Sequence, residues 1–350
     1  MCVDVDKWQQ FHNGKWIGSR LIHKLVTGST NEDAAALSGE LPHGAVIVAD
    51  AQTAGRGRRG RTWVSGAGEN LYFSLLLKPD FAPDKAAMLT LVMALAAARG
   101  MELVYQAARP GDSGQAAGSS QTGQRTGEGD ASMYDTSEDT GRVQIKWPND
   151  IVIHGKKVCG ILTEMQLEAG RIKYVVIGVG VNIHPRDFEA EGLAHASSLE
   201  QELGSAQREY VKCPAEQLMK CTTQAKQPAG NYAEAEENGK NCMETAWFKR
   251  SSTGAEKDTR EVLLSTILTQ FEQYYELFCQ AGNLAPLQEI YQARLVNPGR
   301  EVQVLDPCGS FKGIASGIDE EGRLLVQKPD GSVAKVYAGE VSVRGLYGYV

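Results

Sequence analysis

Residues 54–61 place four arginines and three glycines together in a chain whose formal net charge is −7. Guanidinium groups bind the oxygens of phosphates and carboxylates in a bidentate manner. Glycines let the backbone approach a ligand closely and adopt positive φ angles. A basic cluster in an acidic chain indicates a local site. We call this segment the arginine loop and predict that it closes over a small anion, although a nucleic-acid patch or a solvated tail is equally compatible with these residues alone.

Four further motifs with chemically useful side chains lie in order around the arginine loop. Ser29-Thr30-Asn31 precedes the loop, and Gln52 lies four residues before Arg56. Downstream come Lys-Trp-Pro-Asn-Asp at residues 146–150, Lys-Val-Cys-Gly-Ile-Leu-Thr-Glu at 157–164, and Val-Ile-Gly-Val-Gly-Val-Asn at 176–182. Each motif alone is weak evidence for a site. Their occurrence together is much more specific.

Several of these residues also have a structural interpretation that the sequence leaves open. Ser29 and Thr30 are good helix N-cap residues. Lys146 fits a surface lysine, Lys157 fits a charge on a hairpin, and Asp150 fits the cap of an Asx turn after a proline. Both interpretations therefore stay open on the residues alone.

The last motif contains a Gly-x-Gly pair, Gly178 and Gly180, as dinucleotide-binding loops do. The third glycine of that fingerprint is missing, and the pair lies within an apolar strand instead of opening a helix, so we exclude dinucleotide binding. Glu164 and Asn182 are either site groups or polar residues near strand ends. The structural interpretation is slightly favoured for both.

Hydrophobic periodicity predicts the elements that must position these motifs. Strands are predicted over 21–27, 45–49, 70–77, 142–147, 150–154, 157–166 and 171–181. Helices are predicted over 32–37, 84–105, 262–279 and 284–295. Beyond residue 299, five short runs of period two separated by Gly and Asp turns predict a small β-barrel.

Composition limits the class of protein. The chain has 350 residues, of which 42% are hydrophobic and 23% charged, as in a globular protein with one large and one small domain. We find no apolar run long enough to span a membrane and no signal-peptide core. The seven cysteines are scattered without a C-x-x-C pair, which favours a reduced cytoplasmic protein without zinc or disulfides. The acidic balance argues against a general nucleic-acid binder.

Residues 106–141 and 204–260 are polar and are predicted to be disordered insertions.

Taken in order, the motifs resemble the biotin protein ligase family, whose members activate biotin with ATP and attach it to carboxylases. The resemblance runs from about residue 21 to 182 and resumes over the C-terminal helices and β-barrel. It implies an α+β fold, in which a mixed central sheet with flanking helices, of the class II synthetase-like biotin–lipoate ligase type, precedes a small SH3-like β-barrel. The implied divisions are an N-terminal extension (1–20), a catalytic domain (21–296) and a C-terminal domain (297–350).

The resemblance also implies roles for individual residues. Biotin-binding residues would be Ser29, Thr30, Asn31, Gln52, Arg56, Gly57, Arg58 and Lys146. Lys146 and Arg58 would offset the repulsion between the biotin carboxylate and the α-phosphate of ATP. Beside these, the functional interpretation of Lys157 and Asn182 is contact with the nucleotide and its phosphates, and that of Asp150 is to hold the Mg²⁺ that accompanies ATP. Arg59 and Arg61 are left to fold or solvate the loop.

The implied reaction joins biotin to AMP with release of pyrophosphate. A lysine of a biotin carboxyl carrier protein or domain, as in acetyl-CoA carboxylase, then takes the biotin and AMP departs. No covalently bound cofactor and no membrane partner is expected, and a homodimer is left open. About twenty residues precede the first predicted strand, so we expect a monofunctional ligase without a DNA-binding winged helix. The alternatives are a lipoate-type ligase and a non-enzymatic biotin-sensing or RNA-binding module.

Overall fold

The computed structural model describes residues 3–66, 70–107, 143–203, 259–305, 309–338 and 342–345. Both predicted insertions lie outside the described residues, apart from 106–107 and 259–260 at their margins.

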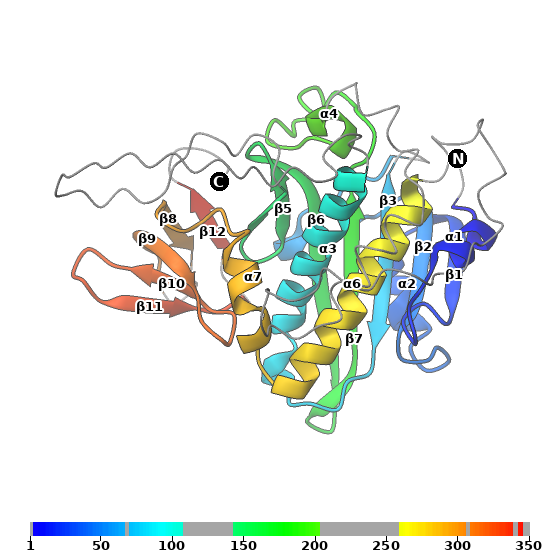
Figure 1. The fold of residues 1–350 in the computed structure, drawn as a ribbon, viewed down its shortest axis with the longest axis horizontal. Helices are drawn as coiled ribbons and strands as arrows, with labels where there is room; N and C mark the ends of the chain where they lie inside the picture. Colours follow the sequence, from blue (N-terminus) through cyan, green and yellow to red (C-terminus); the bar gives the residue numbers. More distant parts are fainter. Residues whose placement is uncertain are drawn as a thin grey trace, which may run out of the picture.

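A mixed β-sheet forms the centre of the molecule (Figure 1). In the described residues it has seven strands in the order β1-β2-β3-β7-β6-β5-β4, and only β1 and β2 run parallel. The strands are β1 (Leu21–Thr27), β2 (Ala45–Gln52), β3 (Leu71–Leu77), β4 (Gln144–Lys146), β5 (Asp150–Ile153), β6 (Lys156–Glu168) and β7 (Arg171–Val181). Every predicted strand of this region is therefore present. The antiparallel β6–β7 hairpin is the longest pair and carries two of the sequence motifs.

Helices cover the two faces of the sheet differently. Two long helices, α3 (Met88–Ala107) and α6 (Thr259–Ala281), lie side by side over one face (Figure 1). The short helix α2 (Thr30–Ala36) packs on the other face, against β2, β3 and β7. Strand alternation explains this, because Val46 and Val48 belong to the core under α3 and α6 whereas Ala45 and Ile47 belong to the smaller core under α2.

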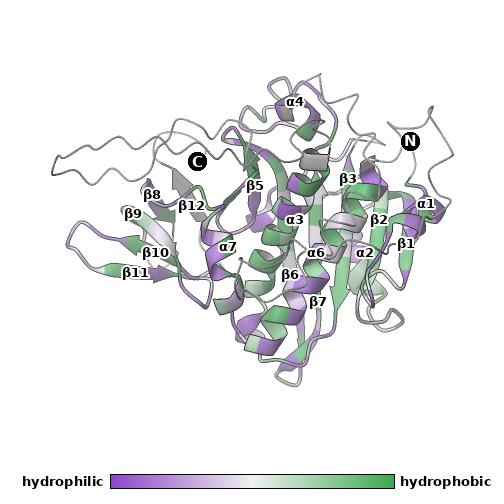
Figure 2. Cartoon of the chain, in the orientation of Figure 1, coloured by the Kyte–Doolittle hydropathy of each residue, from purple (hydrophilic) through white to green (hydrophobic). Residues whose placement is uncertain are grey.

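The apolar helix α3 continues a short 3₁₀ turn, Pro83–Lys85. By length and composition the stretch Pro83–Val104 could cross a membrane, but most of it is buried inside the molecule. Figure 2 colours much of this helix as hydrophobic, and its buried residues belong to the main core. This is how the central helix of a packed domain is arranged.

The first twenty residues contain a helix that the sequence analysis did not predict. Helix α1 (Val5–Phe11) begins at Asp4, whose carboxylate accepts the amide of Lys7. Its Trp8 is buried in the main core. The carboxylate of Glu272 in α6 accepts backbone amides of Lys15 and Ile17, which fixes the chain after α1. The segment thus packs on α6 and on the main core.

The helix predicted over 284–295 is shorter in the structure. A 3₁₀ turn, Ala285–Leu287, leads into α7 (Gln288–Gln292). The chain then leaves the helix because residues 294–296 pair with β4: the Ile145 amide donates to the Arg294 carbonyl and the Val296 amide to the Ile145 carbonyl. Periodicity could not reveal this competing partner. A further short helix, α4 (Leu199–Leu203), ends the segment after β7.

The C-terminal residues form a second, antiparallel sheet. Its five described strands are ordered β11-β10-β9-β8-β12 and comprise β8 (Glu301–Leu305), β9 (Phe311–Ile318), β10 (Leu324–Gln327), β11 (Val333–Val336) and β12 (Ser342–Gly345). Trp147 anchors this unit to the main sheet, since its indole N–H donates to the Gly322 carbonyl and its backbone amide to Asn297 Oδ1. The predicted fold class, a mixed sheet with flanking helices followed by a small SH3-like β unit, is confirmed.

Candidate active site

A cavity opens on the face of the sheet that carries α2, where the arginine loop crosses β6 and β7. Residues of all five sequence motifs meet there. The lining residues are Ser29, Thr30, Asn31, Gln52, Arg56, Gly57, Arg58, Trp63, Asn149, Lys157, Gly160, Ile161, Leu162, Gly178, Val179 and Gly180. Because the side chains of Ile161 and Val179 belong to the core on the far side, Gly160, Leu162, Gly178 and Gly180 face the cavity.

Three glycines form the floor of the cavity. A Cβ atom on Gly178 would overlap Asn31 Oδ1, and one on Gly180 would lie 2.5 Å from the indole nitrogen of Trp63. A Cβ on Gly160 would lie 2.7 Å from the same indole ring. These glycines are therefore required for the close approach of Asn31 and Trp63 to the sheet, and their position inside strands agrees with the exclusion of a dinucleotide loop.

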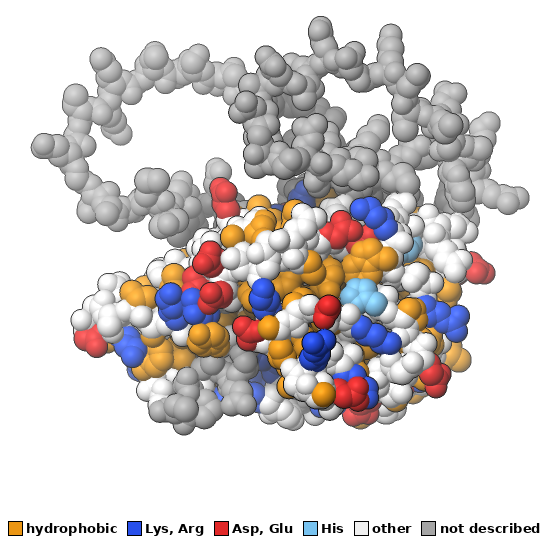
Figure 3. Space-filling view, turned by 90° about the horizontal axis from the view of Figure 1, so that it is seen from below, with side chains coloured by type: hydrophobic (Ala, Val, Ile, Leu, Met, Phe, Trp, Pro, Cys, Tyr) orange, Lys and Arg blue, Asp and Glu red, His pale blue; other side chains and the backbone are white. Residues whose placement is uncertain are grey.

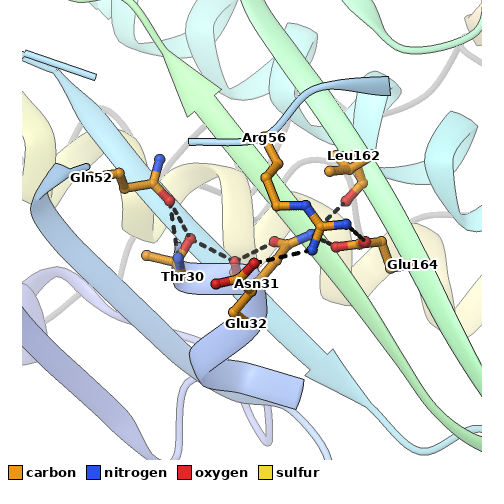
Figure 4. A network of polar contacts seen from close by, with 8 residues as sticks. Thr30, Asn31, Glu32, Gln52, Arg56, Leu162 and Glu164 are labelled. Carbon is orange, nitrogen blue, oxygen red and sulfur yellow. Dashed lines mark hydrogen bonds and ion pairs between the residues drawn. The ribbon is translucent and has the colours of Figure 1, made fainter. Parts of the chain in front are cut away.

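A network of neutral polar groups forms the wall beside α2 (Figure 4). Gln52 Oε1 accepts the Thr30 amide at 3.0 Å, and Gln52 Nε2 donates to Ser65 Oγ at 3.0 Å. The hydroxyl of Ser74 lies 2.7 Å from Thr30 Oγ1 and donates to Asn31 Oδ1 at 2.6 Å. These contacts fix which end of the Gln52 and Asn31 amides carries the oxygen.

Asn31 is fully engaged by protein groups. Its Nδ2 donates to the Leu162 carbonyl at 3.3 Å and to Glu164 Oε2 at 2.8 Å, while Ser74 donates to its Oδ1. A side chain satisfied in this way supports the wall of the cavity and has little capacity left for a ligand.

Ser29 stands at the N-cap position of α2, as its structural interpretation predicts. Within the described part of the chain, however, its hydroxyl makes no capping hydrogen bond. The residue is buried and lines the cavity. Its hydroxyl is therefore not committed to the helix end.

The arginine loop is a small closed turn. The Gly57 amide donates to the Arg61 carbonyl at 2.7 Å, and the Trp63 amide donates to the Gly55 carbonyl at 2.9 Å. A 3₁₀ turn, Arg58–Gly60, lies at its tip, where Arg59 adopts a left-handed φ of 57°. Arg59 and Arg61 are exposed and lie outside the described lining of the cavity, whereas Arg56, Gly57 and Arg58 line it.

Arg58 connects three parts of the molecule. One guanidinium nitrogen donates to Asn149 Oδ1 at 2.9 Å, and the other donates to the Ala338 carbonyl of the C-terminal unit at 3.0 Å. Asn149 is itself held by its Nδ2, which donates to the Ile161 carbonyl. Burial lowers the pKa of Arg58; Asp150 opposes this shift, and Arg59 and Arg61 add to it. A guanidinium remains charged at neutral pH under all such conditions.

The two candidate lysines differ in their placement. Lys157 lines the cavity with its ammonium 2.6 Å from Asp150 Oδ1 and 5.2 Å from the centre of a Trp63 ring. Lys146 lies in β4 opposite Asp150, is only 7% exposed, and is not among the described lining residues. Of the two lysines, Lys157 is thus the one among the described lining residues of this cavity.

Two further predicted site residues have structural partners. Asn182 is buried outside the described cavity lining, and its Nδ2 donates to the Ser197 carbonyl. Asp150 is paired with Lys157, and among the described residues no group of three or more His, Cys, Asp or Glu could hold a metal ion. Burial raises the pKa of the Cys159 thiol, which disfavours the thiolate form.

Sequence reasoning assigned no role to three residues that shape the cavity: Trp63, Ser74 and Asn149. Ser74 carried a detectable signal, because it is a small polar residue at the middle of the fully buried strand β3 and a buried polar group needs a partner. Asn149 lay inside a recognised motif, and Trp63 lay two residues after the arginine loop. Their contacts depend on chain segments that are distant in sequence, and these could not be inferred.

The chain is similar to known protein families and to individual relatives. The biotin/lipoate A/B protein ligase family model matches residues 25–182, and the model of the biotin protein ligase C-terminal domain matches residues 299–344. The bifunctional ligase/repressor BirA of Bacillus subtilis is 30% identical over 330 residues, which span 93% of this chain and 75% of that protein. A biotin–[acetyl-CoA-carboxylase] ligase of Paracoccus denitrificans is 36% identical over 157 residues, 45% of this chain and 52% of that one.

A solved structure shows the same fold. The biotin protein ligase of Aquifex aeolicus in complex with biotin and ATP has a TM-score of 0.59 and 22% identity, covering 93% of this chain and 99% of that one. At this identity the likeness concerns the fold alone. Both family models match in chain order and a relative is 30% identical over three quarters of its own length, so the chain belongs to the biotin/lipoate protein ligase family, among the biotin protein ligases.

Proposed function

We propose that this chain is an ATP-dependent biotin protein ligase that forms biotinyl-5′-AMP, releases pyrophosphate, and transfers biotin to a lysine of a biotin carboxyl carrier protein or domain. The observation that carries the proposal is that one cavity combines a buried network of neutral hydrogen-bonding groups with three cationic side chains, Arg56, Arg58 and Lys157. Biotin has a neutral ureido ring at one end and a carboxylate at the other. The relatives named above support the same activity.

The neutral wall fits the ureido ring. Thr30 and Gln52 present hydroxyl and amide groups in fixed orientations, and the Ser29 hydroxyl is not committed to capping α2. A site that matches each donor and acceptor of a ligand rejects analogues that lack them. Lipoate has no ureido group, so this wall does not favour the lipoate-type alternative. Asn31 would support this wall instead of contacting biotin, because its own amide is already hydrogen-bonded to protein groups.

The cations fit the chemistry of adenylation. The biotin carboxylate must approach the α-phosphate of ATP, which brings two anions together. Lys157 and Arg58 line the cavity and would offset that repulsion, and preorganised charge of this kind is often the largest catalytic contribution. We assign the main role to Lys157 instead of Lys146, because Lys146 is buried outside the described lining. No protein nucleophile is needed for this step.

The arginine loop fits the protection of the product. Biotinyl-AMP is a mixed anhydride that water destroys, and a loop over the cavity would exclude water. The lysine amine of the carrier then forms an amide bond with the biotin acyl carbon, and AMP leaves with the bonding electrons of the anhydride. Trp63 lies on Gly160 and Gly180 beneath the loop and makes the floor apolar.

Mg²⁺ would accompany the nucleotide. Mg²⁺ in nucleotide sites is usually held by one or two carboxylates together with phosphate oxygens. Asp150 is the carboxylate beside the cavity that fits this requirement, once its contact with Lys157 is shared with the phosphates. The ion would supply further neutralisation of the phosphate charge.

We also propose domain bounds and a cellular location for this chain. We place the catalytic unit at residues 21–296 and the C-terminal unit at 297–350, and we add α1 to the catalytic unit because it packs on α6. We place the enzyme in the cytoplasm. On the face in Figure 3, Lys and Arg are interspersed with Asp and Glu, which differs from the basic stripe of an RNA-binding protein.

The test is pyrophosphate release by the purified protein. We expect release only when biotin and ATP are both present, and ATP-dependent labelling of a biotin carrier domain. Lipoate in place of biotin is the matched control and should give neither signal. Release with lipoate but not with biotin would contradict the proposal, as would binding of nucleic acid without any labelling.

A further inference from the structure

We propose that Glu164 is a positioning residue that holds the arginine loop over the cavity by binding Arg56 and Asn31 at the same time. This inference rests on the proposed function, because it concerns how the same cavity is prepared for biotin. Figure 4 shows Glu164 beside the Arg56 guanidinium at one end of the polar network, with Gln52 and Thr30 at the other.

The two oxygens of the Glu164 carboxylate have different partners. Oε1 accepts a hydrogen bond from the Arg56 guanidinium at 2.7 Å. Oε2 accepts one from Asn31 Nδ2 at 2.8 Å. A carboxylate can accept several hydrogen bonds at once, and those from a charged donor are the stronger ones. One side chain therefore joins the loop to the wall of the cavity.

The wall end of this connection is rigid. Asn31 is buried, its amide also contacts the Leu162 carbonyl and Ser74, and it lies so close to β7 that Gly178 can carry no side chain. Glu164 itself is fixed in the β6–β7 ladder, where it pairs with Val176. Its position two residues beyond Leu162 places its side chain on the cavity face.

The loop end of the connection is a closed turn. Hydrogen bonds within the loop, from Gly57 to Arg61 and from Trp63 to Gly55, make the turn a closed body. Arg56 is followed directly by Gly57 and Arg58, which line the cavity. Anchoring Arg56 therefore sets the position of the backbone that faces the ligand. A second carboxylate, Glu32, is 3.5 Å from Arg56 and is more exposed, so it contributes less.

This arrangement predicts an effect on binding and not on chemistry. A loop that is already ordered loses less freedom when the ligand binds. Without the anchor, biotin must order the loop itself, which raises the KM for biotin while the turnover of bound substrate is preserved. A half-exposed ion pair limits the expected effect to about fivefold.

The experiment compares Glu164→Gln with Glu168→Gln. The first variant keeps the side-chain length and an acceptor for Asn31 but removes the charge that holds Arg56. The second removes a charge from the same strand, where Glu168 pairs with the exposed Lys173. Two readouts are used: hydrogen–deuterium exchange of residues 55–63 without ligand, and biotin-dependent pyrophosphate release. Thermal unfolding confirms that each variant is folded.

We expect Glu164→Gln to speed exchange in the loop and to raise the biotin KM about fivefold with kcat within about twofold, whereas Glu168→Gln leaves both unchanged. In an Arg56→Ala background, Glu164→Gln should add no further rise in KM, because it acts through Arg56. Unchanged exchange, an unchanged or lower KM, or additive effects in the double variant would overturn the proposal. A wild-type protein that releases no pyrophosphate would contradict the proposed function, and the exchange data would then still decide whether Glu164 holds the loop.

Discussion

The two sides of the cavity are built from different physical interactions. The wall beside α2 consists of buried, uncharged groups such as Thr30 and Ser74, which are 3% and 0% exposed. The arginine loop opposite is held by ion pairs, and the Arg56 side chain is 46% exposed. Buried neutral networks give fixed geometry because an unmatched group is costly. Exposed charges give weaker, adjustable contacts that salt screens. In the proposed function, the neutral wall would recognise the ureido ring of biotin. The charged loop would bind the carboxylate and phosphate groups, whose charge changes during the reaction.

The largest expected effect concerns the cation that faces the cavity. Lys157→Ala should reduce the kcat/KM for biotin-dependent pyrophosphate release about 10²- to 10³-fold, since it removes preorganised charge. Lys146→Ala is the matched variant and should mainly lower the melting temperature, because Lys146 is buried outside the described lining. Equal losses of activity in both variants would contradict the assignment of Lys157.

The next effect tests the rigidity of the neutral wall against that of the loop. In Gly178→Ala the new methyl group collides with Asn31, which is held by three groups, and biotin binding should weaken by about 3 kcal/mol. In Gly180→Ala the methyl group meets the indole of Trp63, which can move with the loop, so the loss should stay near 1 kcal/mol. Calorimetric titration with biotin measures both, and the reverse order would show that the wall yields more easily than the loop.

Ser74→Ala should have a smaller effect on the same wall. It leaves the buried Asn31 Oδ1 without its donor, which costs about 1 to 2 kcal/mol in the free energy of unfolding. Denaturant unfolding measures this, and the exposed Ser316→Ala in the C-terminal sheet is the control. A change in Ser74→Ala no larger than in that control would mean that Asn31 does not depend on Ser74.

The smallest effect distinguishes the two sides by salt alone. Because the Debye length falls from about 10 Å at 0.1 M to about 3 Å at 1 M, added salt should weaken the contact of Arg56 with Glu164. Amide exchange in residues 55–63 should rise slightly with salt, while exchange at the start of α2 should stay constant. An equal change of amide exchange with salt in both regions would contradict the contrast between a neutral wall and an ionic loop.

Local patterns were sufficient for most of the fold. The strands of the main sheet follow from alternation and apolar runs, and α6 follows from its helical periodicity, because these signals lie within single segments. Helix α7 shows the limit of this reasoning. The predicted helix extends to residue 295, but residues 294–296 pair with β4, which is about 150 residues away in sequence. The helix α1 was likewise missed, since it is stabilised by its contacts with α6.

The sequence by itself determined the motifs, their order and the family to which they belong, because residue types and spacings are properties of the chain. Only the tertiary structure shows that Lys157 lines the cavity, because β6, which carries Lys157, also contributes Gly160 to the cavity floor. It also showed that the Asn31 amide is satisfied by Ser74, Leu162 and Glu164, which are 43 to 133 residues away. Such contacts depend on how strands and loops meet in space, and the sequence of any one segment does not contain that information.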